Sequence, residues 1–214
     1  MRLDHISYVA SHDQISDVVN RIGSQIGTAF VDGGIHPKFG TRNFTAPLLN
    51  GQYIEVVCPL DHPATDATPF GKAVKQKANA GGGWLTWVLA TDDISELEKR
   101  IGRKSVLGVR VRPDNSQLHW KQVGVQSILD QNELPFFIEW LTDNHPSQDG
   151  KPFSEIYRIE INGNLDRIEK WLGQRVSNLN LSCDLEIKSQ NIEMPEAGTQ
   201  RVVFKTKNGL ISVY

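Results

Sequence analysis

The chain has 214 residues, of which 39% are hydrophobic and 22% are charged, values typical of a soluble globular protein. Its formal net charge of −2 gives no electrostatic reason to expect binding to nucleic acid or to an anionic membrane surface. The longest apolar runs, such as Trp84 to Ala90, have the length of a strand and are far too short to span a membrane. These values exclude nucleic-acid and membrane partners from our expectations.

The chain contains two cysteines, Cys58 and Cys183, and both lie in strand-like segments. Two thiols in a chain of this size favour reduced core residues in a cytoplasmic protein, with a disulfide as the less favoured alternative.

The first unit begins with residues 2–10, where apolar and polar residues alternate with period two. This alternation predicts a strand with His5 and Leu3 on one face and Asp4 on the other. The pattern that follows predicts a β-α-β-β-β unit. Its later elements are a helix at 14–22, strands at 28–31, 44–49 and 52–59, a Gly-rich loop at 32–43 and a hairpin turn at Asn50-Gly51.

The remaining sequence predicts two more units of the same kind, joined by polar or helical linkers. The second unit consists of a connecting helix at 68–79, a strand at 84–90, a helix at 94–101 and strands near 106–112, 118–126 and 135–142. A polar segment at 144–150 precedes the third unit, which consists of a strand at 157–161, a helix at 165–172 and strands near 181–188, 201–205 and 210–214.

Internal repeats support this division. Residues 54–63 and 138–146 carry nearly the same phrase, which makes Glu55 and Glu139 equivalent positions. A second phrase ending in glycine closes a helical pattern at 19–23, 98–102 and 169–173. We therefore interpret the chain as a first module at 1–66, a linker helix and second module at 67–146, and a third, degenerate module at 151–214. The third module carries Ser212 in place of the repeated glutamate.

This organisation resembles the vicinal oxygen chelate superfamily, and within it the glyoxalase-like domain proteins. The motifs that carry the resemblance are Leu3-Asp4-His5-Ile6, Gly33-Gly34-Ile35-His36-Pro37, Gly40-Thr41-Arg42-Asn43, Tyr53-Ile54-Glu55-Val56-Val57, Arg112-Pro113-Asp114, Leu118-His119-Trp120 and Phe137-Ile138-Glu139. The resemblance implies an α+β fold in which tandem βαβββ modules form a curled mixed sheet, or cup. A third, partial βαβββ-like module would pack beside it.

The resemblance also implies a divalent metal, held by His5, Glu55 and Glu139. Zinc, nickel, manganese and iron suit a histidine with two carboxylates. The family pattern has a fourth ligand near position 85, where this chain has Leu85-Thr86. No nucleotide fingerprint is present, since Gly81-Gly82-Gly83 precedes a strand and not a helix.

Three side chains are candidates for proton transfer. Glu55 and Glu139 lie on strands among apolar residues, where a carboxylate is costly unless it meets a cation or a donor. His36, in the Gly-rich loop, is a third acid–base candidate. The alternatives are structural ion pairs from the glutamates to Arg42, Arg110 or Arg112, and a loop-ordering hydrogen bond for His36. The candidates for substrate contact are Asn43, Arg42 and Trp120.

Two functions remain open. The first is a metal-dependent enzyme of lyase, isomerase or dioxygenase type that acts on a small oxygenated substrate. The second is a metal-free protein that binds a small molecule in the same cup, as resistance proteins do by sequestration. The partner in both cases is a small molecule, and the chain is expected to be a monomer or a homodimer.

Overall fold

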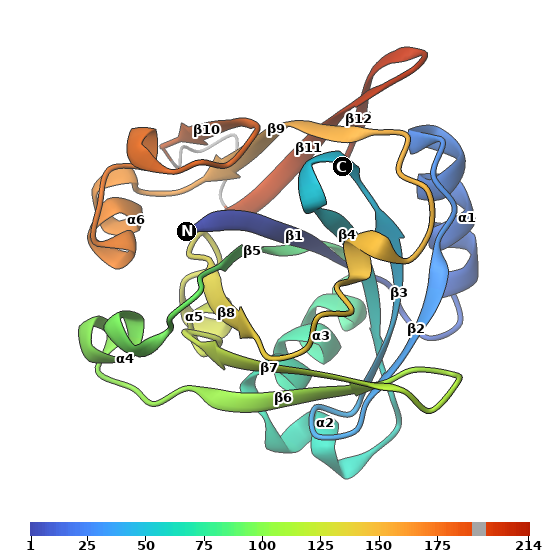
Figure 1. Cartoon of the computed structure of the whole chain (residues 1–214), viewed down its shortest axis with the longest axis horizontal. Coiled ribbons are helices and arrows are strands. Elements are labelled where there is room, and N and C mark those ends of the chain that lie inside the picture. Colours follow the sequence, from blue (N-terminus) through green and yellow to red (C-terminus); the bar gives the residue numbers. More distant parts are fainter. Residues whose placement is uncertain (190–195) are drawn as a thin grey trace.

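The structure is a computed structural model that describes residues 1–189 and 196–214; residues 190–195, in the expected third module, lie outside the described residues. Its helices and strands follow one another as shown in Figure 1. In chain order they are β1 Arg2–Val9, α1 Ile15–Ile26, β2 Val31–His36, β3 Thr41–Pro47, η1 Leu49–Gly51, β4 Tyr53–Pro59, α2 Pro63–Ala67, α3 Pro69–Asn79, β5 Gly83–Ala90, α4 Ser95–Ile101, β6 Val106–Val111, β7 Gln117–Val123, α5 Ser127–Asp130, β8 Phe136–Trp140, η2 Pro146–Gln148, β9 Glu155–Asn162, α6 Leu165–Leu172, η3 Val176–Asn178, β10 Asp184–Lys188, β11 Gly198–Thr206 and β12 Gly209–Val213.

Eight strands close into a barrel in the order β1-β4-β3-β2-β6-β7-β8-β5. In each half the first strand runs parallel to the last one, as β1 does to β4 and β5 to β8. The two halves meet where β1 pairs antiparallel with β5 and where β2 pairs with β6. The predicted α+β fold with a curled mixed sheet is confirmed, and the cup is closed all the way round.

A second sheet of four strands forms outside the barrel in the order β10-β9-β11-β12. Its elements follow the order β-α-β-β-β, but its strand order differs from that of the barrel halves. The first strand, β9, lies between β10 and β11, whereas the last strand, β12, lies at the edge. Ser212, on β12, is paired with Val203. It therefore does not occupy the place that Glu55 has beside β1.

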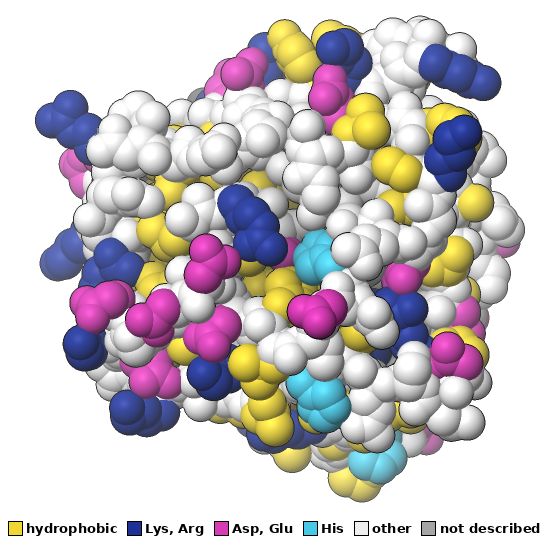
Figure 2. Space-filling model, in the orientation of Figure 1, with side chains coloured by type: hydrophobic (Ala, Val, Ile, Leu, Met, Phe, Trp, Pro, Cys, Tyr) yellow, Lys and Arg dark blue, Asp and Glu magenta, His cyan; other side chains and the backbone are white. Residues whose placement is uncertain are grey.

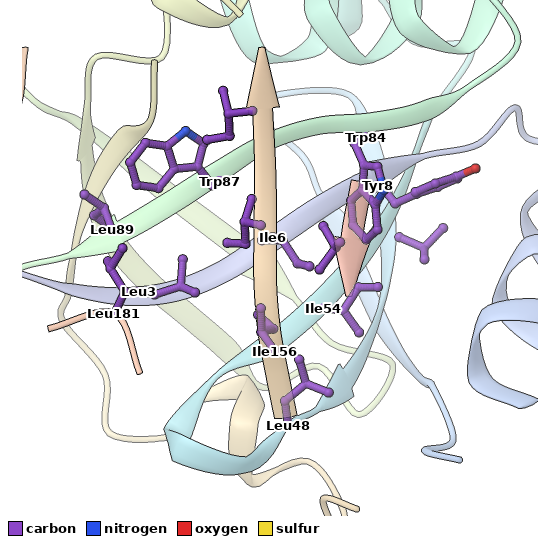
Figure 3. Packing of buried hydrophobic residues seen from close by; sticks show 14 of the residues in the cluster. Leu3, Ile6, Tyr8, Leu48, Ile54, Trp84, Trp87, Leu89, Ile156 and Leu181 are labelled. Atoms are coloured by element: carbon purple, nitrogen blue, oxygen red, sulfur yellow. The ribbon is translucent and has the colours of Figure 1, made fainter. Parts of the chain in front are cut away.

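The second sheet packs on the outer face of β1 and β5 (Figure 3). Leu3, Ile6 and Trp87 from the barrel share one buried cluster with Ile156 and Phe204 from the sheet. Each of these side chains is at most 2% exposed, so each contributes about 1.5–3 kcal/mol of hydrophobic stabilisation. This packing fixes β1, the strand that supplies Asp4 and His5 to the barrel interior.

Each end of the barrel is covered. At one end lies α3, which begins at the N-cap Thr68 and turns Phe70 and Val74 towards the inward side chains Val57 and Val88. At the other end residues 141–154, here called the strap, cross from β8 towards β3, where η2 packs (Figure 1). On the face seen in Figure 2, acidic and basic side chains are interspersed. Within the described parts of the chain, no helix combines the length and the apolar character needed to cross a membrane.

The seam between β2 and β6 depends on one glycine. Gly34 has φ +93°, and a Cβ there would lie 1.9 Å from the backbone oxygen of Val111. Ile35 pairs with Val111 in this seam. Any side chain at position 34 therefore pushes β2 away from β6.

We expect Gly34→Ala to destabilise the protein more than Gly81→Ala, a matched control with φ +100° and nothing within 4 Å of a built Cβ. The control should lose roughly 1–2 kcal/mol from the unfavourable backbone conformation alone. Gly34→Ala should lose roughly a further 1–3 kcal/mol from the clash. Urea unfolding of both variants measures the difference, and equal losses would show that the seam does not need the close approach.

Candidate functional site

A cavity of about 30 Å³ lies inside the barrel. Its lining combines aromatic side chains with convergent polar groups, the pattern typical of small-molecule sites. The polar members are His5, His36, Asn43, Tyr53, Glu55, Arg110 and Gln122.

A β-bulge on β1 brings Asp4 to the inside. The β1–β5 register shifts between Leu3 and His5, so Asp4 is the extra residue. Leu3 then joins Ile6 in the outer core, and Asp4 lies beside His5. The strict alternation that the sequence predicts, with Leu3 on the His5 face and Asp4 on the other, is wrong at this point for that reason.

Asp4 is fully buried and joins three parts of the molecule. Its Oδ2 lies 2.8 Å from His5 Nδ1, and its Oδ1 lies 3.0 Å from His145 Nε2 in the strap. Trp140 Nε1, on β8, donates to the same Oδ1 at 3.1 Å. Burial raises the pKa of Asp4, but the hydrogen bonds from His145 and His5 outweigh it and hold the pKa well below its usual range.

The ionised Asp4 fixes the proton position on His5. An ionised carboxylate only accepts hydrogen bonds, so His5 Nδ1 carries the hydrogen and Nε2 keeps its lone pair in the neutral ring. The ring stacks on Tyr53 with its centroid 4.4 Å away. His5 is thereby held in one orientation and lines the cavity.

Glu55 is buried with both oxygens satisfied. Ser7 Oγ donates to Oε2 at 2.7 Å, and Asn43 Nδ2 donates to Oε1 at 2.7 Å. Burial raises the pKa of Glu55, but His5, His36 and these two hydrogen bonds lower it below its ordinary value. Glu55 is therefore an ionised, fixed carboxylate on the cavity wall.

His36 is a neutral member of the cavity wall. Its Nδ1 lies 2.9 Å from Thr41 Oγ1, and its ring contacts the edges or faces of Phe39, Phe70 and Trp120. Burial lowers the pKa of His36 to about 4. Its ring therefore carries no charge near neutral pH.

Arg110 is the most unusual group in the cavity. Its residue is 2% exposed, and neither Nε nor Nη2 has a hydrogen-bond partner in the described structure. The nearest acidic oxygen is Asp149 Oδ2, 3.8 Å from Nη2, and that oxygen already accepts from Arg112 at 2.8 Å. Burial lowers the pKa of Arg110, because the charged form loses its hydration.

Five of the sequence-predicted site residues line this cavity. His5 and Glu55 come from neighbouring parallel strands, β1 and β4, and Asn43 comes from β3. The other two, His36 and Trp120, form part of the opposite wall.

Glu139 does not lie in the cavity, and the expectation that it faces Glu55 is wrong. On β8 the inward residues are Phe136, Ile138 and Trp140, so Glu139 points outward. There Lys121 Nζ donates to its Oε1 and the backbone N–H of Ile94 donates to its Oε2, both at 3.0 Å.

The register of the parallel strands explains this outcome. Inward Ser7 pairs with Glu55 across β1 and β4, whereas inward Ala90 pairs with Ile138 across β5 and β8. Glu139 is thus one residue beyond the inward position. A slip of one residue in a strand turns a side chain to the other face.

Arg42 also lies outside. It stands on β3 between the buried Thr41 and Asn43, so its side chain points away from the cavity, where it forms an ion pair with Asp32. Its guanidinium lies 5.7 Å from the centre of the Phe44 ring. Arg42 is therefore not in a position to contact a ligand inside the barrel.

Sequence reasoning missed Asp4 and Tyr53, and it considered Arg110 only as an ion-pair partner. Period two along β6 places Arg110 on the same face as Gly108, whose missing side chain leaves room for Trp120. A glycine and a charged residue on the same face of one predicted strand were therefore the sequence feature that could have indicated an arginine in the cavity. Nothing in the sequence pattern marks the bulge at Asp4.

The polar groups do not fit the divalent metal that the family resemblance implies. Within residues 1–189 and 196–214, no three His, Cys, Asp or Glu side chains are grouped so that they could hold an ion. Of the three expected ligands only His5 and Glu55 line the cavity, because Glu139 is on the outer face.

Comparisons with known proteins identify a matching family and a protein with a similar fold. The profile of the family described as a glyoxalase-like domain matches residues 3–175, the family that the sequence motifs resemble. A hypothetical protein from Staphylococcus aureus shares the fold with a TM-score of 0.68 and 18% identity, over 96% of this chain and 91% of that one. Methylmalonyl-CoA epimerase from Mycobacterium tuberculosis aligns with a TM-score of 0.42 and 15% identity, over 64% of this chain and 85% of that one. No curated protein matches the sequence.

The low pKa of His36 predicts a pH dependence of stability. The unfolded chain takes up a proton at this histidine below about pH 6.5, whereas the folded chain does so only at about 4. The free energy of unfolding should therefore fall by about 2 kcal/mol between pH 7 and pH 5 from this group alone. His36→Gln, which keeps a polar group near Thr41, should flatten that slope in urea titrations, and an unchanged slope would contradict the assignment.

Proposed function

The chain belongs to the glyoxalase-like domain family, and we propose that its barrel binds a small molecule bearing a carboxylate, without a metal ion. The observation that carries this proposal is the buried Arg110 guanidinium, two of whose nitrogens have no hydrogen-bond partner among the described residues. A buried charge is costly unless it is paired and hydrogen-bonded. A planar guanidinium matches a carboxylate with two parallel hydrogen bonds, so a ligand carboxylate would remove this cost.

The other walls suit the rest of such a ligand. Trp120, Phe136 and Trp140 supply apolar surface for its body. Glu55 carries a negative charge that repels an anion, but its two oxygens already accept hydrogen bonds from Ser7 and Asn43. The cavity volume of about 30 Å³ has room for about one or two water molecules, so the walls must move to admit a larger ligand.

A second candidate is an enzyme of lyase or isomerase type that uses the same cavity. The observation that favours it is the Asp4–His5 pair, in which a buried carboxylate orients an imidazole whose Nε2 keeps a lone pair. A histidine held in this way is suited to general acid–base catalysis. A metal-dependent form would have only His5 and Glu55 as ligands in the cavity, because Glu139 lies on the outer face, and two ligands do not support it.

The remaining expectations about the chain's setting stay proposals. The free Cys58 and Cys183 support a cytoplasmic location. A monomer or a homodimer remains the expected state, since one chain completes its own barrel.

Arg110→Met should abolish stabilisation by carboxylate ligands and leave the stability of the ligand-free protein unchanged or raised by about 1 kcal/mol, since a costly buried charge is removed. Thermal shift with acetate, pyruvate and benzoate measures both effects. A carboxylate at one hundred times its Kd should stabilise the wild type by about 2.7 kcal/mol. The control is Arg158→Met, which removes an arginine of the second sheet that does not line the cavity and leaves Asp149 untouched. Equal ligand shifts in wild type and Arg110→Met would refute the proposal.

Metal analysis tests the metal-free part of the proposal directly. Protein produced with Ni²⁺, Mn²⁺, Fe²⁺ and Zn²⁺ available should contain no stoichiometric metal, because only two of the three expected ligands, His5 and Glu55, line the cavity. Treatment with a chelator should leave the thermal midpoint unchanged. Stoichiometric metal that disappears in both His5→Ala and Glu55→Ala would instead support the metal-dependent enzyme.

A further inference from the structure

A second pocket, here called the outer groove, lies on the outside of the barrel next to the start of α3. It has a volume of about 190 Å³, more than that of the cavity. Three cationic residues, Lys38, Arg103 and Lys104, line it together with apolar residues such as Val106 and Val125. No acidic residue is part of its lining.

We propose that the outer groove binds the far end of the ligand whose carboxylate meets Arg110, so that the ligand is an elongated molecule with an anionic group at each end. This inference rests on the proposed function, because it takes Arg110 as the first anion site. The far group is a carboxylate or a phosphate, which a cluster of positive charges attracts alike.

The groove and the cavity share a wall. Phe39, Phe70 and Gln122 line both of them. The two phenylalanine rings meet edge to face with centroids 5.7 Å apart, and both are nearly buried. On the proposal these rings move when the ligand binds, and their displacement joins the two spaces. Such a passage also gives a ligand a route into the cavity, whose volume of about 30 Å³ is otherwise too small for it.

The strand β6 sets the length of the ligand. Val106 lines the groove and Arg110 lines the cavity, four residues farther along the same strand. At about 3.3 Å per residue, the backbone positions of Val106 and Arg110 are about 13 Å apart, and we take this length as the scale of the separation between the two anion sites. A dicarboxylate with about ten carbons in an extended chain spans this distance, whereas succinate does not.

The positive charges of the groove are available to a ligand. Lys38 Nζ donates to the neutral backbone oxygen of Leu107 at 3.1 Å. Lys104 pairs with Glu98, outside the groove, and its side chain is 91% exposed. Exposed ion pairs of this kind contribute little, so an anion can compete for Lys104. With Arg103, the groove offers three cations against one neighbouring carboxylate.

Calorimetric titration of the whole chain with decanedioate and decanoate tests the inference, since the two differ in one end group. The wild type should bind decanedioate about tenfold more tightly, because hydrogen bonds to charged groups are stronger than contacts with a methyl end. That advantage should disappear in the double variant Arg103→Gln/Lys104→Gln, while the affinity for decanoate stays the same. A decanoate that carries a terminal phosphate should show the same advantage or a larger one.

The matched control is Lys72→Gln/Lys75→Gln, which removes the same charge from α3 outside the groove. It should keep the full preference for decanedioate. Equal affinities for the two acids, or a preference that survives in the groove variant, would overturn the inference while leaving the proposed function intact if Arg110→Met still prevents binding. Failure of every carboxylate to bind the wild type would overturn both.

Discussion

The buried carboxylate of Asp4 is the interaction on which the arrangement of the cavity depends. It holds His5 on β1, Trp140 on β8 and His145 in the strap, three segments far apart in the sequence. Because it is fully buried, loss of His5 would leave Oδ2 without a partner, and loss of His145 or Trp140 would leave Oδ1 with only one. The bulge that places Asp4 inside therefore also closes the barrel mouth and orients the imidazole.

The ionisable groups of the cavity differ in their charge and in whether the protein already supplies their hydrogen-bond partners. Glu55 is ionised, but Ser7 and Asn43 compensate it locally. His36 is neutral because of burial. Among the described residues Arg110 is the charged member with unused donors, so on the proposed function it is the place where an anion binds in spite of the charge of Glu55. Composition alone could not show this, since the net charge of −2 points to no anionic partner.

The sequence predicts the fold class and five cavity residues through its repeated units and the motifs that resemble the family. His5 and Glu55 lie on predicted strands, whereas the loop predicted at 32–43 contains His36 and Asn43, which lie instead on β2 and β3. The failures come from features that periodicity does not encode. The bulge shifts Leu3 and Asp4, and the one-residue difference in register between β4 and β8 turns Glu139 outward. A sequence segment that occurs twice predicts a strand at both places, but it does not determine which face of the sheet a given residue occupies.

A divalent cation and a buried arginine can serve the same purpose, since each supplies positive charge where a ligand oxygen must bind. In this chain His5 and Glu55 stand where the family resemblance implies metal ligands, yet each is fixed by neighbours of its own. Arg110 enters the same cavity from the opposite half of the barrel. On the proposed function its guanidinium supplies the charge, and its planar geometry selects a carboxylate. The unpaired donors of Arg110 then lower the stability of the ligand-free protein, and such a loss of stability in favour of binding is common at functional sites.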